Sequence, residues 1–361
     1  MIIIVKKKAS SMDCSNSHCE RENSDDASLK WDLMNFGDPW TAVKCSKKES
    51  IVYVSCINPR RDKPDYLAVV DVDDNSPTFC KVQAAFKSLH NYLDYVSKMC
   101  RNAPLVQPFQ VVHRVHMPGL GDEVHHFGWN HCVGCRCDPN MKRSHLLMPS
   151  LHSNQIHVID ATKPKQPIYY KIGLLVAQTD LSLLNPCGRR KETIDLNEHN
   201  ISFPHTVHCL PSGKIMVSFM GDGNDKAQGN FAVIDGETFE FEGKWSNENA
   251  PFGYDFWYKP NLNILISSSW GSPNVIKSGL FEKSDLGVKY GHYLYFWDYT
   301  TKKRIQTMDL GLDDGCMALE VRMCHDPQSS HGYVVTGVGG SIFHFWQESP
   351  ERPALQEYTV I

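Results

Sequence analysis

The stretch Tyr293-Leu294-Tyr295-Phe296-Trp297-Asp298 is a run of large apolar and aromatic side chains that ends on an aspartate. A polar turn follows it, and then a second, more alternating run at Ile305–Met308. Short apolar runs that are bounded by turn residues are typical of β-strands, and two of them joined by a polar turn predict an antiparallel hairpin.

The same unit of strand, aspartate-led turn and strand recurs along the chain. The other copies are Tyr66–Asp71 with Phe79–Val82, Ile156–Asp160 with Ile168–Ile172, Phe231–Asp235 with Phe241–Trp245, and Ile342–Trp346 with Tyr358–Val360. In the last copy Gln347 stands where the aspartate is expected. Four more strands are predicted ahead of hairpins, at Ile51–Ile57, Lys214–Ser218, Ile264–Ser268 and Tyr333–Thr336.

The later copies are spaced by roughly 50 to 60 residues, near the roughly 40 to 50 residues of a four-stranded propeller blade. The sequence therefore predicts an all-β fold, a β-propeller. A two-sheet sandwich also consists of hairpins, but it has no reason to repeat the same aspartate turn.

The domain organisation follows from where this rhythm begins and where it is interrupted. Residues 1–44 are polar and lack a sustained apolar period, so they are predicted to form a disordered tail. Residues 45–361 are predicted to form one propeller domain. Two stretches, near 83–110 and 173–194, each follow the second strand of a blade and are predicted to be insertions.

Composition narrows the class of partner. The net charge is −4 and the hydrophobic content is 41%. No basic field is present for nucleic acid or anionic lipid, and the apolar run at Met1–Val5 is too short to form a membrane segment. The odd count of 13 cysteines and the absence of a signal sequence favour reduced thiols in the cytosol. Protein partners cannot be inferred from the sequence.

The stretch Glu123–Cys137 gathers side chains that bind transition metals such as zinc and copper, because it holds three histidines and three cysteines. The adjacent His125 and His126 would point to opposite faces of a strand, so they can converge only on a loop. Cys132 and Cys135 have the Cys-x2-Cys spacing found in metal-binding sites and in redox-active cysteine pairs. The alternative is a turn with buried thiols and histidines that merely hydrogen-bond the backbone.

A propeller site lies where inner strands of several blades converge, so one or two residues from each repeat are expected to contribute to it. The candidate metal ligands are His125, His126, His205, His208 and His325. For each histidine alone a structural role is as plausible, and copper, iron and zinc would all suit such a set.

Four other residues are candidates for chemistry. Glu320 and Arg322 lie close to His325 in the sequence. Asp255 sits in an aromatic run, where it can orient an imidazole or simply pack between blades. Cys56 ends a predicted strand and is either a nucleophilic thiol or an inert, buried small hydrophobe.

Several long motifs closely resemble the selenium-binding protein family, also known as methanethiol oxidases, from about residue 45 to the end of the chain apart from the two insertions. These motifs are Ile51–Ile57, Pro64–Asp73, Asp122–Cys135, His205–Leu210, Gly253–Tyr258 and Leu319–Arg322.

The resemblance implies an enzyme of sulfur metabolism in the cytosol, with the nucleus as a second location. The implied reaction oxidises methanethiol with dioxygen and water to formaldehyde, hydrogen peroxide and hydrogen sulfide, with copper as cofactor. Cys56 matches the selenium-associated cysteine of the family and is expected to bind selenium. We expect the copper ligands to come from these five histidines, not necessarily from all of them, and we expect Glu320, Arg322 and Asp255 to be catalytic.

The resemblance also implies a seven-bladed ring, of which this chain would lack about two C-terminal blades. An open ring exposes strand edges, so we expect this chain to be weakly active or inactive. Two alternatives remain at this point. One is a non-catalytic selenium- or thiol-binding protein that acts through Cys56 in redox chemistry or intracellular transport, and the other is a propeller scaffold for protein partners.

Overall fold

The computed structural model describes residues 49–76, 79, 111–131, 142–170, 193–279 and 281–347, together with the backbone of 358–360. The predicted tail at 1–44 and the predicted insertion at 83–110 lie outside these residues. Of the second predicted insertion, only residues 193 and 194 are described, and they belong to a short strand.

The described strands form five antiparallel sheets. The first consists of β1 (Ile51–Cys56), β2 (Tyr66–Asp71) and β3 (Val111–His116). The second consists of β4 (Gly128–Trp129), β5 (His145–Ser150), β6 (Gln155–Asp160) and β7 (Ile168–Tyr169), with β8 (Thr193–Asp195) also paired to β6. The third consists of β9 (Ile201–Cys209), β10 (Lys214–Asp222), β11 (Asn230–Asp235) and β12 (Phe241–Lys244). The fourth consists of β13 (Gly253–Lys259), β14 (Ile264–Ser269), β15 (Tyr293–Asp298) and β16 (Arg304–Asp309). The fifth consists of β17 (Ala318–Met323), β18 (Gly332–Thr336), β19 (Ile342–Gln347) and β20 (Tyr358–Val360).

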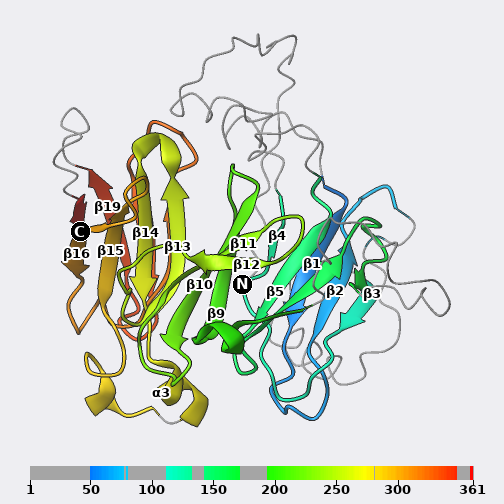
Figure 1. The fold of residues 1–361 in the computed structure, drawn as a ribbon, viewed down its shortest axis with the longest axis horizontal. Coiled ribbons are helices and arrows are strands. Elements are labelled where there is room, and N and C mark those ends of the chain that lie inside the picture. The colour runs from blue at the N-terminus through cyan, green and yellow to red at the C-terminus, as the bar shows by residue number, and fades with distance from the viewer. Residues whose placement is uncertain are drawn as a thin grey trace, which may run out of the picture.

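The sheets follow one another in space in the same order as in the chain (Figure 1). In sheets two to five each strand pairs with the next, and the first strand of one sheet lies against the early strands of its neighbour, as β13 does against β10 and β17. A succession of four-stranded meanders that meet along their first strands is the arrangement of a β-propeller. The predicted all-β propeller is therefore confirmed.

Helices are few and short in the part of the chain that the structure describes. They are η3 (Leu196–His199), η4 (Pro260–Leu262), α3 (Pro273–Ser278) and η5 (Lys283–Asp285). None of the described helices has the length and apolar character needed to cross a membrane.

The aspartates that end the third strand of most sheets have a structural reason to recur. Asp235 Oδ1 accepts hydrogen bonds from the backbone N–H groups of Glu237 at 2.9 Å and Thr238 at 2.8 Å. Asp160 accepts in the same way from the Thr162 N–H at 2.8 Å. A carboxylate in this place satisfies turn N–H groups that the ladder cannot reach, which is the Asx-turn mechanism.

The position of this aspartate shows that the first sheet differs from the others in which of its strands are present among the described residues. The strand that ends on the aspartate, or on Gln347, is the third of its sheet in sheets two to five, but β2 with Asp71 is only the second of its sheet. Within the described ranges, no strand occupies the innermost position beside β1. This explains why Ile51–Cys56, predicted as a buried strand, is only half-buried, with Val52 43% exposed.

One predicted hairpin is wrong in its second strand. Phe79 lies in a turn, and no described strand begins there. The strand that pairs with β2 is β3 (Val111–His116). The predicted Phe79–Val82 strand otherwise lies outside the described residues. A polar turn directly after an aspartate does not determine how far along the chain the next strand begins.

Aromatic side chains fill the space between the third and fourth sheets. Phe231 of β11 lies 5.1 Å from Phe256 of β13 and 5.8 Å from Trp297 of β15, measured between ring centroids. All three side chains are almost completely inaccessible to solvent. Burying such rings contributes on the order of 2 kcal/mol each and holds the third and fourth sheets in a fixed relation.

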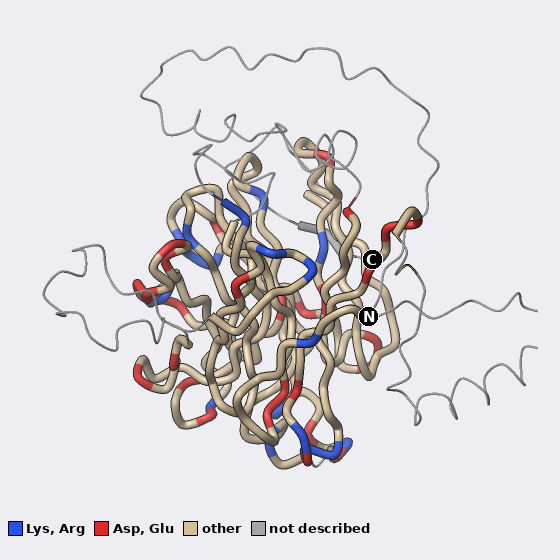
Figure 2. Tube along the Cα trace, turned by 90° about the vertical axis from the view of Figure 1, so that its right-hand side faces the viewer, with Lys and Arg blue, Asp and Glu red and all other residues tan. Residues whose placement is uncertain are grey.

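Charged residues of both signs are scattered along the described trace (Figure 2). Several pair across turns and edges, as Lys214 Nζ does with Asp235 Oδ2 at 2.9 Å and Lys277 Nζ with Asp225 Oδ2 at 2.6 Å. Because these pairs are partly exposed, each adds little to stability.

The aspartate turn yields a direct test. We expect Asp235→Ala to lower the free energy of unfolding by about 1 kcal/mol, because two turn N–H groups and Lys214 lose their acceptor. Asp235→Asn keeps an acceptor oxygen and should cost less. Urea unfolding followed by tryptophan fluorescence checks the order, and equal stability of the alanine variant and the unmodified chain would contradict it.

Candidate metal centre

Side chains from the first strands of four successive sheets meet in one place. His125 and His126 precede β4, and His205 lies in β9. Asp255 lies in β13, and Glu320 lies in β17. This arrangement agrees with the expectation that each repeat supplies one or two residues to a shared centre.

A bulge in each of these inner strands positions these residues. In β9, His205 and Thr206 together lie opposite the single residue Ser218 of β10. In β13, Tyr254 and Asp255 lie opposite Ser268 in the same way. A bulge breaks the alternation of faces along a strand, so two consecutive side chains can serve one site.

The other two inner strands show the same irregularity. Leu319 and Glu320 of β17 lie opposite Val335 alone. Before β4, three residues that include His125 and His126 separate the paired positions 124 and 128, whereas only two residues lie between their partners, 150 and 147. The two adjacent histidines therefore escape the opposite orientations that a regular strand would impose.

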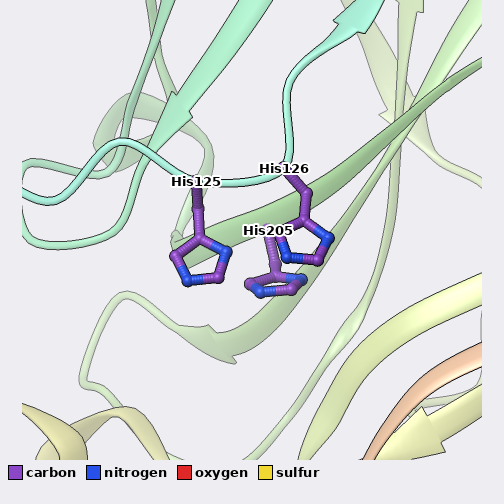
Figure 3. A group of neighbouring side chains, drawn as sticks. All are labelled: His125, His126 and His205. Carbon is purple, nitrogen blue, oxygen red and sulfur yellow. The ribbon is translucent and has the colours of Figure 1, made fainter. Parts of the chain in front are cut away.

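Three imidazoles are gathered at the centre (Figure 3). The ring centroids of His125 and His126 are 4.7 Å apart, and the rings are nearly parallel. His205 lies 4.3 Å from the first and 4.6 Å from the second, and one nitrogen from each ring lies within 4.8 Å of the other two. A single ion can be shared by nitrogens this close.

The electrostatic state of these rings suits a metal ligand. Burial lowers the pKa of His125 to about 3, and the neighbouring His126 adds to the effect. Burial also lowers the pKa of His126 and, most strongly, that of His205, which has no exposed surface. All three are therefore neutral at physiological pH, and a neutral imidazole has the lone pair that a metal requires.

Two nitrogens in this group are buried without a hydrogen-bond partner. They are Nδ1 of His125 and Nε2 of His205. A buried polar atom without a partner costs about 1 to 3 kcal/mol and calls for an explanation, such as an ion. The two unpartnered nitrogens are placed where a metal ion could bind them, so the residues present fit a metal site.

The carboxylate of Asp255 lies beside the histidines and is completely buried. Its Oδ1 accepts a hydrogen bond from the Thr206 hydroxyl at 2.8 Å. Its Oδ2 accepts from the Val321 backbone N–H at 2.8 Å and pairs with Arg322 Nη1 at 2.5 Å. The Thr206 hydroxyl therefore lies between the Asp255 carboxylate and the His205 ring.

Glu320 connects this carboxylate network to the histidines. Its Oε1 lies 3.2 Å from His126 Nε2, and its Oε2 lies 2.5 Å from Arg322 Nη2. Burial raises the pKa of the Glu320 carboxyl to about 7, with the Asp255 charge adding to the shift and Arg322 opposing it. A carboxylate bonded to one nitrogen of a histidine leaves the other nitrogen free for a metal.

Two residues of the site were not predicted from the sequence. Thr206 follows His205 directly, and Tyr254 packs its ring 3.7 Å from the His205 ring, between centroids. Burial raises the pKa of the Tyr254 hydroxyl well above its usual range, so it stays protonated. Both could have been found from their place in the sequence, because Thr206 follows the predicted His205 and Tyr254 precedes the predicted Asp255.

The structure does not bring His208 and His325 to this group. The Nε2 atom of His208 lies 3.1 Å from the Phe256 carbonyl oxygen. His325 is exposed in the bend that follows β17. Cys132 and Cys135 lie outside the described residues.

Cys56 lies at the end of β1, opposite Tyr66 and outside the metal-binding group. Its thiol is half-buried and lies 3.7 Å from the Val54 carbonyl oxygen. Burial raises the pKa of the Cys56 thiol, while Tyr66 and Arg114 oppose the shift. A protonated thiol is a weak nucleophile, so the reactivity of Cys56 is restrained in this state.

Comparison with known proteins places these features in context. Residues 90–361 match the family described as 56 kDa selenium-binding protein. The chain is 42% identical over 317 residues to a methanethiol oxidase of Danio rerio, covering 86% of this chain and 58% of that protein. It is 36% identical over 318 residues to a methanethiol oxidase of Homo sapiens, covering 86% of this chain and 57% of that protein.

A solved structure gives the same picture. The X-ray structure of a hypothetical selenium-binding protein from Sulfolobus tokodaii is 28% identical, covers 91% of this chain and 63% of that chain, and superposes with a TM-score of 0.69. The chain thus spans less than two thirds of the length of these relatives. With a family match over three quarters of its residues and a bulged, histidine-bearing propeller centre, the chain belongs to the 56 kDa selenium-binding protein family.

Proposed function

We propose that this chain carries the metal centre of a methanethiol oxidase, which converts methanethiol, dioxygen and water to formaldehyde, hydrogen peroxide and hydrogen sulfide. The observation that carries the proposal is the group of three neutral histidines with two buried, unpartnered nitrogens. The similarity to proteins named methanethiol oxidase supplies the reaction. We place this activity in the cytosol, where thiols stay reduced.

Copper is the proposed metal, and His125, His126 and His205 would hold it. Copper suits imidazole ligands and would supply the one-electron chemistry that dioxygen requires. Neutral nitrogens that are already packed within reach of one another reduce the ordering that metal binding costs. His208 and His325 are left out of the proposed ligand set, since neither lies in this group.

The acidic residues would have different tasks. Glu320 lies beside His126 with part of its side chain exposed, so its carboxylate can take up a proton that leaves the substrate thiol. Arg322 bridges Glu320 and Asp255 and holds both carboxylates in place. We therefore assign a catalytic role to Glu320 and positioning roles to Arg322 and Asp255.

The wall around the histidines would exclude water from the reacting centre. The Tyr254 ring covers His205, and Trp270 packs against Tyr254 at 5.1 Å between centroids. A dry, aromatic wall strengthens electrostatic interactions inside the site and suits a small apolar substrate such as methanethiol.

A second candidate function, selenium binding, is favoured by the family description and by the half-buried thiol of Cys56. The Cys56 thiolate would attack the selenium of a selenenyl sulfide, so that a new sulfur–selenium bond forms as the thiolate of that compound leaves. Because Cys56 is not part of the metal-binding group, the chain can carry both functions, or selenium binding alone without catalysis.

The metal assignment is tested by copper content. We expect His205→Ala to reduce bound copper from about one per chain to about one tenth of that or less, because a three-histidine site loses its most buried ligand. Loss of peroxide release on addition of methanethiol in air should accompany it. Copper is measured by mass spectrometry of the purified chain after dialysis.

His208→Gln is the matched control, since it removes a histidine from the same strand and leaves the group intact. It should keep copper and peroxide release within about twofold of the unmodified chain. Stoichiometric copper in the His205→Ala chain would refute the ligand assignment. Full copper with no peroxide release in the unmodified chain would refute the oxidase function but leave the metal site standing.

The raised pKa of Cys56 predicts slow thiol chemistry near neutral pH. Iodoacetamide should label Cys56 about tenfold more slowly in the folded chain at pH 7.5 than in the urea-unfolded chain, and the gap should narrow as the pH rises above 9. Peptide mass spectrometry resolves this cysteine from the others. Faster labelling in the folded chain would show an activated thiol instead.

A further inference from the structure

Thr206 lies between the proposed metal ligand His205 and the buried carboxylate of Asp255. Its hydroxyl oxygen is 2.9 Å from His205 Nδ1 and 2.8 Å from Asp255 Oδ1. We infer that Thr206 is a positioning residue that selects the tautomer of His205 and thereby leaves Nε2 as the nitrogen that binds metal. This inference rests on the proposed function, because it concerns the same histidine group.

The direction of the hydrogen bonds determines which nitrogen of His205 carries the proton. An ionised carboxylate only accepts, and Asp255 is paired with the Arg322 guanidinium and the Val321 N–H on its other oxygen. The single hydroxyl proton of Thr206 is therefore directed to Asp255. The Thr206 oxygen is left as an acceptor, so the bond to His205 requires the proton to be on Nδ1.

A neutral imidazole with its proton on Nδ1 has its lone pair on Nε2. That atom of His205 is buried and has no hydrogen-bond partner in the structure. The relay from carboxylate to hydroxyl to imidazole thus accounts for both nitrogens of one ring. It is a carboxylate–histidine–metal arrangement with a hydroxyl inserted between its first two members.

The backbone fixes Thr206 in this place. Its N–H donates to Ser218 Oγ at 3.0 Å, and the Ser218 hydroxyl donates in turn to the Tyr254 carbonyl oxygen at 2.5 Å. Only 3% of the Thr206 surface is exposed. Because the residue is held by its neighbours, its hydroxyl acts as a rigid link and not as a freely rotating group.

A matched pair of variants separates positioning from packing. Thr206→Val keeps the shape of the side chain but removes the hydroxyl, and Thr206→Ser keeps the hydroxyl but removes a methyl group. We expect the valine variant to bind copper about 10- to 100-fold more weakly than the unmodified chain, and the serine variant to stay within about threefold. Affinity is measured by competition with a chelator, and the Cu²⁺ EPR spectrum should change in the valine variant alone.

A measurement without a variant or a metal complements this pair. In the metal-free, unmodified chain, the imidazole ¹⁵N shifts of His205 should report a proton on Nδ1, with His205→Gln used for assignment. A proton on Nε2 would overturn the inference even if the valine variant fails to fold.

The outcomes also separate this inference from the proposed function. Equal copper affinity and equal EPR spectra in the unmodified and valine chains would overturn the role of Thr206 and leave the metal centre intact. An unmodified chain that binds no copper would overturn the proposed metal centre, and the metal-orienting role of Thr206 with it.

Discussion

A single buried carboxylate connects the architecture of this protein to its chemistry. Asp255 is inaccessible to solvent and is bonded to Thr206 of the sheet before it and to Val321 and Arg322 of the sheet after it. An unpaired charge in this position would cost several kcal/mol, so the three inner strands have to keep the registers that satisfy it. The same bonds orient the groups around the histidines. Packing of the sheets and positioning of the site therefore depend on one residue.

The way the inner strands bring side chains to the centre is also shared. In β9, β13 and β17, two consecutive residues lie opposite one residue of the next strand. Two residues before each of these pairs, Phe203, Phe252 and Met317 adopt a positive φ, which is uncommon for non-glycine residues. Backbone strain of this kind persists only where surrounding contacts maintain it, and in these three strands it precedes a residue of the candidate centre.

Local patterns were sufficient to predict much of this protein. Strand runs that end on an aspartate, such as Tyr293–Asp298, specified the hairpins, because the aspartate has a fixed role in the turn. The clustered His125, His126 and His205 pointed to the centre. The bulges could not be foreseen, because they depend on pairing between strands and leave no mark in a single strand. The sequence alone therefore did not separate His208 from His205 as a ligand, and Thr206 looked like an ordinary strand residue.

The bulges also bear on how this kind of centre can change over evolution. Residues at a bulge lie outside the regular ladder, so replacing their side chains does not disturb the pairing of the sheet. The blades that contain β9, β13 and β17 each offer two such positions. A residue that is bonded to neighbouring sheets, as Asp255 is, can be exchanged only together with its partners. A propeller with this inner lining presents exchangeable side chains around its axis while the sheets themselves stay unchanged. New donors, acids or aromatic rings can replace the existing side chains at these positions while the fold stays the same, provided that bonds between blades are replaced together.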